Sequence, residues 1–266
     1  MNKQPIFILG LGAQKAGTSW LHKQLSRLSN VNFGVLKEYH IWDALYVGHC
    51  DRWIVDHPTG KPPLEILRYL MQTGKDAYEK YFYGLIGDKI RLTGDITPSY
   101  AALNKFQLQV VKSRLESVGF TVKVIFLMRD PVSRNWSALR FYNRQRINRG
   151  NISVLQLVEQ FEKFYSSQEV IDRVSYDKTV PAIYGAFRKD DVFISFYETL
   201  FTERTMSQLS DFFGVGIREF DLSEKINATK SIDLPKRDYD RCRKVFSNVY
   251  SFCEHEFPET KTLWKS

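Results

Sequence analysis

The chain has 266 residues, of which 43% are hydrophobic and 14% aromatic, enough for one sizeable buried core. We therefore expect a single domain over residues 1–266. The formal net charge of +8 favours an anionic ligand or polyanionic partner, but no zinc-finger spacing, RNA-binding motif or basic region with heptads occurs, so nucleic acid is not an expected partner. No apolar run reaches the ~18 residues of a transmembrane helix.

The N-terminal residues bear on the compartment of the protein, and the number and spacing of the cysteines bear on whether they form disulfides. Met1–Pro5 leads directly into a strand-like stretch and leaves no room for a signal peptide, so we expect a cytoplasmic protein. The three cysteines, Cys50, Cys242 and Cys253, are an odd number without metal-ligand spacing. We expect Cys242 and Cys253 to share one helix, about 16 Å apart at 1.5 Å of rise per residue, and all three to be free thiols.

The first segment of the chain predicts a strand, a glycine loop and a helix. Ile6–Leu9 is a continuous apolar run that ends in Gly10–Gly12, which is typical of a buried parallel strand. Thr18–Leu28 follows with apolar residues at helical spacing. Val31–Phe33 predicts a further short strand.

Two later strands complete the pattern of a parallel sheet. Val122–Met128 is strongly apolar, and Pro131 suits the first turn of a helix that we expect to run to about Ile147. Val192–Phe196 predicts a strand between two helical stretches. Strands that alternate with helices indicate an α/β fold of three layers, with a central parallel sheet flanked by helices.

The rest of the chain is mostly helical by its pattern. The residues at about 51–89 are aromatic, irregular and rich in proline, and we expect an insertion over the sheet edge whose aromatic residues form core and some acceptor-pocket wall. Asn227–Arg237 is polar and predicts a loop. Four segments have the apolar periodicity of helices: Leu103–Ser117, Val154–Tyr165, Met206–Phe213 and Tyr239–Phe257.

The glycine loop predicts a phosphate site. Gly12–Ser19 matches the phosphate-binding pattern G-x-x-x-x-G-K-[ST] in its glycines and serine, but Thr18 stands in place of the lysine and a lysine occurs earlier, at Lys15. Such glycines let backbone N–H groups face an anion at a helix N-terminus. The alternative is an ordinary strand-to-helix turn with an exposed lysine. The compact run from Lys15 to Trp20 after a buried strand favours the phosphate site.

Several segments resemble PAPS-dependent sulfotransferases, with motifs closest to the carbohydrate-type and bacterial members. Gln14–Leu21 resembles the loop that binds the 5′-phosphosulfate, and Arg129–Ser137 resembles the second donor motif of the family. Asp95–Tyr100 and Phe196–Leu200 are similar to two further family segments. The resemblance implies a P-loop-like fold, PAPS as donor, PAP as product and no metal.

The resemblance also implies which residues bind the donor. Arg129 and Ser137 would hold its 3′-phosphate, which suits the paired hydrogen bonds of a guanidinium. Lys15 would bind the bridging oxygen and stabilise charge on the departing phosphate. Lys230 and Arg237 stand where the family has a late loop that closes over the nucleotide. The phosphosulfate loop would contribute Lys15, Ala16, Gly17, Thr18, Ser19 and Trp20.

A general base is predicted after the first helix. The segment Lys37–Asp43 resembles the K-E-x-H-F-F-D segment of heparan sulfate and related carbohydrate sulfotransferases. The resemblance implies Glu38 as the base, with His40 and Asp43 in support, and favours a sugar acceptor. Alternatively, Glu38 is a surface carboxylate paired with Lys37, or His40 is the base, because a histidine serves in the small-molecule sulfotransferases.

The acceptor and two rival functions remain open at this stage. The acceptor bears a hydroxyl and is a neutral or anionic glycan, with a peptide tyrosine, a lipid or a small alcohol as alternatives. The rivals are a P-loop kinase or hydrolase, with Asp130 as its acidic residue, and a non-catalytic nucleotide-binding module. Five arginines would grip an anionic acceptor or form a solvated helix face: Arg134, Arg140, Arg144, Arg146 and Arg149.

Overall fold

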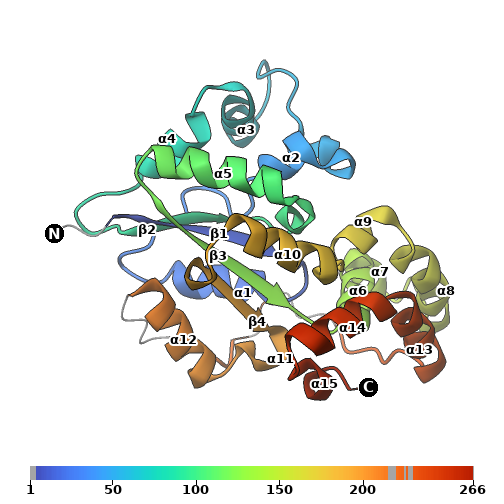
Figure 1. Cartoon of the computed structure of the whole chain (residues 1–266). Coiled ribbons are helices and arrows are strands. Elements are labelled where there is room, and N and C mark those ends of the chain that lie inside the picture. Colours follow the sequence, from blue (N-terminus) through green and yellow to red (C-terminus); the bar gives the residue numbers. More distant parts are fainter. Residues whose placement is uncertain (1–3, 215–219, 225, 227–229, 266) are drawn as a thin grey trace.

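A central parallel sheet organises the fold in the computed structural model, which describes residues 4–214, 220–224, 226 and 230–265. The sheet has four strands in the order β2-β1-β3-β4, and all its neighbours pair in parallel. Helices cover both faces (Figure 1), so the predicted α/β fold is confirmed. The strands are β1 (Ile6–Gly12), β2 (Leu92–Ile96), β3 (Thr121–Met128) and β4 (Val192–Phe196).

Strand β2 was not expected from the sequence. Its five residues are all buried, but Gly94 and Asp95 interrupt the apolar run by which the other strands are recognised. The fold accommodates Asp95 because buried hydroxyl groups donate to its carboxylate, from Thr97 at 2.6 Å, Tyr100 at 2.7 Å and Tyr78 at 3.1 Å. The predicted strand at Val31–Phe33 is reduced to one bridge between Val31 and Leu92.

The helices form two layers around the sheet. In Figure 1, α5 (Lys105–Ser117) and α10 (Tyr176–Ala186) lie above it, and α1 (Thr18–Leu25) and α12 (Glu203–Phe213) lie below it. The C-terminal α14 (Ser247–Glu256) packs on α10. The other helical elements are α2 (Trp42–Tyr46), η1 (Gly48–Trp53), α3 (Pro63–Thr73), α4 (Ala77–Tyr83), η2 (Pro98–Ala102), α6 (Pro131–Tyr142), α7 (Arg144–Asn148), α8 (Val154–Tyr165), α9 (Gln168–Asp172), η3 (Lys189–Asp191), α11 (Tyr197–Leu200), α13 (Lys236–Val245) and α15 (Thr260–Leu263).

Two helices predicted as continuous are broken. The helix that begins at Pro131 ends at Tyr142, where the side-chain amide of Asn143 donates to the carbonyl of Leu139 at 3.1 Å, and α7 starts afresh. The predicted helix at 239–257 is likewise divided into α13 and α14 at Phe246.

The second break corrects the placement of the cysteines. Cys242 lies on α13 and Cys253 on α14, so they do not share a helix as expected. Both of them and Cys50 are nevertheless free and buried, as predicted. Burial raises the pKa of Cys50 to about 11, which keeps that thiol protonated and unreactive.

The segment at 51–89 contains α3 and α4, and side chains from both helices join the main core. Tyr78 and Phe82 of α4 pack with their rings 4.9 Å apart, and Phe82 also meets Phe7 of β1 at 5.0 Å. Over the described ranges, no helix has both the length and the apolar character needed to cross a bilayer.

Candidate active site

The carboxyl ends of the strands gather the residues of the candidate site at one edge of the sheet, where open α/β sheets bind their ligands. The loop at 13–17 follows β1, and Pro98 and Ser99 follow β2. Arg129 follows β3, and Tyr197 follows β4. Segments far apart in the sequence are thereby brought into contact.

Glycines shape the loop after β1. Gly12 has φ +122°, and a Cβ there would lie 2.7 Å from the carbonyl oxygen of Pro98. Gly17 has φ +96°, and a Cβ there would lie 2.4 Å from Cδ2 of Leu200. Both positions therefore need glycine. The loop delivers the chain to α1, which begins at Thr18 with its positive N-terminal end toward the loop.

Two arginines fix the backbone of this loop. Arg134 is fully buried, and it donates from Nε to the carbonyl of Gln14 at 3.0 Å and from Nη2 to the side-chain oxygen of Gln14 at 2.7 Å. Arg129 donates to the carbonyl of Lys15 at 3.0 Å. Arg134 thus neither lies on a solvated helix face nor reaches toward an acceptor, contrary to both expectations. It stabilises the loop through its hydrogen bonds to Gln14.

A cluster of cations surrounds Lys15. Burial and the charges of four arginines, Arg129 first, lower the pKa of Lys15 to about 8. The ammonium lies 4.2 Å from the ring centre of Phe141, and the Arg129 guanidinium lies 4.1 Å from that of Tyr197. Within the described part of the chain, neither Lys15 nor Arg129 forms an ion pair with a carboxylate. Positive charges that lack a carboxylate in direct contact suit a multiply charged anion.

Arg140 belongs to the same cluster, although the sequence grouped it with acceptor-binding or solvated arginines. Its Nε is buried without a hydrogen-bond partner among the described residues, and its Nη1 donates to the carbonyl of Lys230 at 2.9 Å. Burial and the charge of Arg129 lower its pKa. Arg140 follows Ser137 by three residues, so both lie on one face of α6. The spacing of three residues after Ser137 is the sequence signal that could have placed Arg140 in this cluster.

The remaining predicted donor residues are placed as follows. Ala16, Thr18 and Ser137 are buried, and Ser19 is half-buried in the first turn of α1. Lys230 is exposed, with its carbonyl held by Arg140. The residues around it at 227–229, part of the predicted loop, lie outside the described residues.

Trp20 and Arg237 face elsewhere. Trp20 is buried, with its ring 5.0 Å from Phe201 and 6.0 Å from Phe220, and its indole N–H donates to the carbonyl of Asp221 at 3.2 Å. It therefore holds the segment at 220–221 against α1. Arg237 is in the first turn of α13 and lines a groove against α8, so the structure does not bring it to the loop.

Glu38, His40 and Asp43 form a hydrogen-bonded chain. Nε2 of His40 lies 3.4 Å from the Glu38 carboxylate, and Nδ1 lies 2.6 Å from the Asp43 carboxylate. The hydroxyl of Ser99 also donates to Asp43, which is fully buried. Lys37 pairs with the outer side of Glu38, and one third of the Glu38 side chain is exposed.

The pKa shifts indicate which of these three groups accept hydrogen bonds and which donates them. Burial disfavours the ionised form of Glu38, but His40 and Lys37 outweigh it and lower the pKa of Glu38 to about 2. Burial opposes the charged form of His40 too, yet the hydrogen bonds to Asp43 and Glu38 raise its pKa. Glu38 is therefore an ionised hydrogen-bond acceptor, and the charged form of His40, which the raised pKa favours, donates on both sides. This arrangement favours Glu38 over His40 as the group that receives a proton.

Neighbouring side chains fix the position of the histidine. The ring of Trp53 stacks on that of His40 at 3.9 Å and 7°. Arg68 donates to the carbonyls of Tyr39 at 2.9 Å and Glu38 at 3.3 Å, and Gln72 donates to that of Trp53 at 2.9 Å. Trp53 thus lies at the candidate site and lines its pocket.

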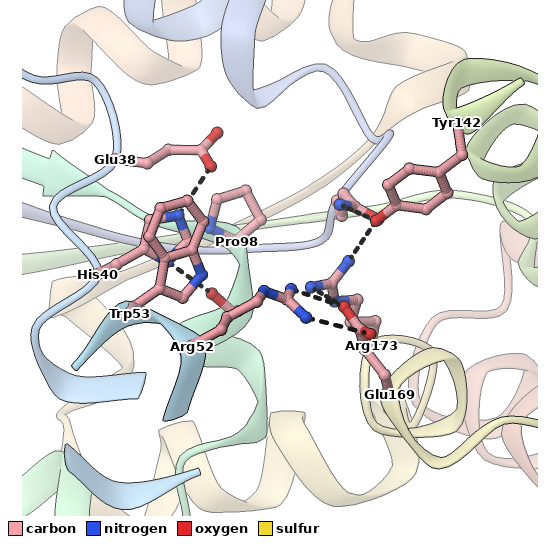
Figure 2. A pocket seen from close by; sticks show the side chains of 10 residues that line it. Glu38, His40, Arg52, Trp53, Pro98, Tyr142, Glu169 and Arg173 are labelled. Carbon is pink, nitrogen blue, oxygen red and sulfur yellow. Dashed lines mark hydrogen bonds and ion pairs between the residues drawn. The ribbon is translucent and has the colours of Figure 1, made fainter. Parts of the chain in front are cut away.

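A pocket of about 390 Å³ lies between the Glu38–His40–Asp43 cluster and the loop at 13–17; it is called the acceptor pocket here, after the hydroxyl acceptor that the sequence leads us to expect. In Figure 2, Glu38 and His40 lie on one side of it, and Tyr142 and Arg173 lie on the other. Gln14 of the loop lines the pocket as well. Its full lining is Gln14, Glu38, His40, Arg52, Trp53, Pro98, Ser99, Tyr142, Glu169 and Arg173.

Comparison with known proteins identifies the family. The sulfotransferase domain family matches residues 3–240. The chain is a sulfotransferase by family. No curated protein matches its sequence.

One solved structure agrees with this membership at the level of the fold, and two others have lower similarity. A sulfotransferase from Alicyclobacillus acidocaldarius aligns with a TM-score of 0.58 and 16% identity over 96% of each chain. The sulfotransferase domain of the curacin biosynthetic pathway aligns at 0.45 and 18% identity, over 92% of this chain and 97% of that one. A mouse sulfotransferase complexed with PAP aligns at 0.45 and 13% identity, over 99% and 89%. The two scores of 0.45 are too low for a structural argument.

The far wall of the acceptor pocket in this sulfotransferase was missed by sequence reasoning. Arg52, Tyr142, Glu169 and Arg173 come from η1, α6, α9 and the residue after α9, and no short motif links them. The phenol oxygen of Tyr142 accepts from Nη1 of Arg173 at 3.0 Å and from the Gln14 amide at 3.2 Å. The far wall of the pocket is thereby connected to the donor loop.

Among the described residues of the sulfotransferase, no three His, Cys, Asp or Glu side chains are grouped to hold a metal ion. Asp130, the acidic residue of the rival kinase hypothesis, is otherwise engaged. It caps α6 by accepting from the N–H of Ser133 at 2.7 Å, and it accepts from the hydroxyls of Tyr250 at 2.5 Å and Tyr239 at 3.1 Å.

Proposed function

We propose that this sulfotransferase moves the sulfuryl group of PAPS to an acceptor hydroxyl, with a carbohydrate as the favoured acceptor and Glu38 as the general base. One observation carries the proposal: the ionised Glu38 and Gln14 of the donor loop line the same pocket. A hydroxyl compound in this pocket would lie next to a proton acceptor and to the donor loop at once.

The donor side of the site fits a nucleotide with phosphates at two positions. The loop at 13–17 and the N-terminus of α1 suit the 5′-phosphosulfate, because backbone N–H groups there are oriented by glycines and by the helix. Arg129, Ser137 and Arg140 suit the 3′-phosphate. The buried, unpartnered Nε of Arg140 supports this assignment, since a buried guanidinium donor without a partner costs free energy.

PAPS supplies the sulfuryl group, and the residues of the protein handle the charge and the proton. The acceptor oxygen forms a bond to sulfur while the bond between sulfur and the phosphate oxygen breaks, and the hydroxyl proton passes to Glu38. A carboxylate with a pKa of about 2 is a weak base, but the hydroxyl becomes strongly acidic as its oxygen bonds to sulfur. His40 holds the carboxylate in place and is itself held by Asp43.

Lys15 serves the leaving group. Negative charge moves onto the 5′-phosphate as its bond to sulfur breaks, and an ammonium beside that oxygen stabilises the transition state. The arginines around Lys15 disfavour its charge when no anion is near, so a bound phosphate and Lys15 stabilise one another.

The decisive experiment combines transfer and binding. Labelled PAPS is incubated with a panel of glycans, lipids and phenols, and sulfated products are detected by mass. Glu38→Gln keeps the shape of the side chain and removes the proton acceptor, so transfer falls by about 10²–10⁴ in kcat. The affinity for PAP, measured by calorimetry, stays within about twofold because Glu38 does not belong to the donor loop.

Glu116→Gln is the matched control. Glu116 is an exposed carboxylate on α5 that pairs with Lys112 at 3.8 Å, and its loss leaves both measurements unchanged. Undiminished transfer by Glu38→Gln would remove Glu38 as the base. Magnesium-dependent ATP turnover without any response to PAPS would overturn the proposed function as a whole.

A further inference from the structure

A second carboxylate lines the acceptor pocket opposite Glu38. Glu169 of α9 lies across the pocket from Glu38 (Figure 2), with 31% of its side chain exposed. No role in donor binding or proton transfer accounts for it. A carboxylate at this place is a group that a bound acceptor can contact directly.

Two arginines hold Glu169 in one orientation. Nη2 of Arg52 lies 2.9 Å from Oε1, and Nη2 of Arg173 lies 2.7 Å from the same oxygen. Oε2 has one long contact, 3.5 Å from Nη1 of Arg52. A carboxylate oxygen can accept about two hydrogen bonds, so Oε2 retains the capacity to accept from a ligand.

Glu169 stays ionised beside the acceptor. Burial alone would raise its pKa, but the hydrogen bond from Arg52 and the charge of Arg173 lower it. An ionised carboxylate accepts hydrogen bonds and donates none. Its ligand is therefore a hydrogen-bond donor, such as a hydroxyl.

The charged side chains of the pocket are already joined in ion pairs, unlike those of the donor loop. Arg52 and Arg173 both pair with Glu169, and Lys37 pairs with Glu38. An acceptor with a carboxylate or sulfate of its own would meet two carboxylates and would have to break an existing ion pair. Around Lys15, by contrast, the positive charges lack such partners among the described residues.

We propose that Glu169 binds a second hydroxyl of a neutral polyhydroxylated acceptor, such as an uncharged sugar, while the reacting hydroxyl faces Glu38. This inference rests on the proposed function, because it takes the Glu38 pocket to be the place of transfer. The pocket volume of about 390 Å³ is near the lower end of small-molecule sites and suits a short saccharide or the end of a longer one.

Selectivity follows from the hydrogen bond to Glu169. A site built to bind a hydroxyl strongly rejects an analogue that lacks it, because the polar group of the protein is left without a partner. We therefore expect three kinds of acceptor to be ranked. By kcat/KM, neutral sugars rank first. Analogues that lack the one hydroxyl contacted by Glu169 rank second, and sugars that bear a uronic acid rank last.

The test begins with the unaltered protein and PAPS. Neutral oligosaccharides, the same oligosaccharides with a uronic acid, single deoxy analogues and simple phenols are compared by kcat/KM. We expect the neutral sugars to exceed the uronic acid sugars at least about tenfold, which corresponds to one unfavourable charge contact. This comparison needs no variant to fold.

Glu169→Gln is then compared with Glu162→Gln. Glu162 also pairs with an arginine, Arg241 at 3.2 Å, but it lies on α8 outside the acceptor pocket. Glu169→Gln is expected to raise KM for the neutral sugar about tenfold with the PAP affinity unchanged, and to have little effect on the one deoxy analogue that lacks the contacted hydroxyl. Glu162→Gln leaves KM unaltered.

The outcomes separate this inference from the proposed function. Preferred sulfation of phenols or of uronic acid sugars, or a KM that does not respond to Glu169→Gln, would overturn the assignment of Glu169 while sulfuryl transfer stands. Absence of transfer to every acceptor by a chain that binds PAP would overturn the proposed function itself, and the role of Glu169 with it.

Discussion

The lowered pKa of Lys15 predicts how donor binding depends on pH. With a pKa of about 8, Lys15 loses its charge as the pH rises from 7 to 9 in the free protein. A bound phosphate favours the charged form, so PAP binding above pH 8 must take up a proton. The affinity for PAP therefore falls as the pH rises.

The size of the effect follows from the same pKa. At pH 9 roughly one tenth of the free protein carries a charged Lys15, so the dissociation constant of PAP rises about tenfold relative to pH 7. Proton uptake per PAP bound rises from about 0.1 at pH 7 to about 0.9 at pH 9. Calorimetry in buffers of different ionisation enthalpy measures both quantities. The phosphates of PAP, with second pKa values near 6, do not titrate in this range.

Lys15→Met supplies the decisive comparison. It weakens PAP binding about tenfold or more at pH 7 and removes the dependence on pH above 8. Lys23→Met is the control, because Lys23 lies on the same α1 but is half exposed and pairs with Glu224. If Lys15→Met kept the slope of the unaltered protein, the titrating group would lie elsewhere and the reasoning on the cation cluster would be refuted.

Three further predictions concern the supports of the site. Arg134→Met leaves the carbonyl and side-chain oxygen of Gln14 without their donor, and we expect a loss of about 2 kcal/mol or more in the free energy of unfolding, measured with denaturant. Gly17→Ala raises the dissociation constant of PAP about tenfold or more. Gly150→Ala also places alanine at a positive φ, +69°, but in open space and without the clash with Leu200, and it leaves PAP affinity unchanged; equal effects would contradict a special role of the loop. Asp43→Asn removes a charge that raises the pKa of its histidine partner, so the pH profile of kcat shifts to lower pH and kcat falls about tenfold with PAP affinity unaltered; an unshifted profile would argue against the hydrogen-bonded chain.

The proposed donor half of the site could be located in the sequence because it lies within two short segments. Each follows a buried strand, and the residues that fix the loop are set by local geometry, such as the left-handed backbone of Gly17. The family assignment and the α/β fold were confirmed on that basis. Strand β2 was not predicted because Asp95 interrupts its apolar run, and the local pattern does not show that hydroxyls such as those of Tyr78 and Tyr100 satisfy this buried carboxylate.

The acceptor half could not be predicted in the same way. In the sequence Glu169 and Arg173 look like ordinary charged residues, and only their contacts with Arg52 of η1 and Tyr142 of α6 place them at a pocket. Arg134 was misjudged for a related reason. A buried arginine and a solvated one look alike in sequence. The two Gln14 oxygens that accept hydrogen bonds from Arg134 belong to a distant segment of the chain.

The Gln14 amide is shared by the two halves of the site. Its side-chain oxygen is held by Arg134 below the donor loop, while its nitrogen donates to Tyr142 in the acceptor pocket. An acceptor that shifts Tyr142 would therefore act on the loop that we propose binds the nucleotide. Because such coupling is reciprocal, an acceptor that tightens PAP binding is itself bound more tightly by the same factor. Product inhibition by PAP then depends on which acceptor fills the pocket.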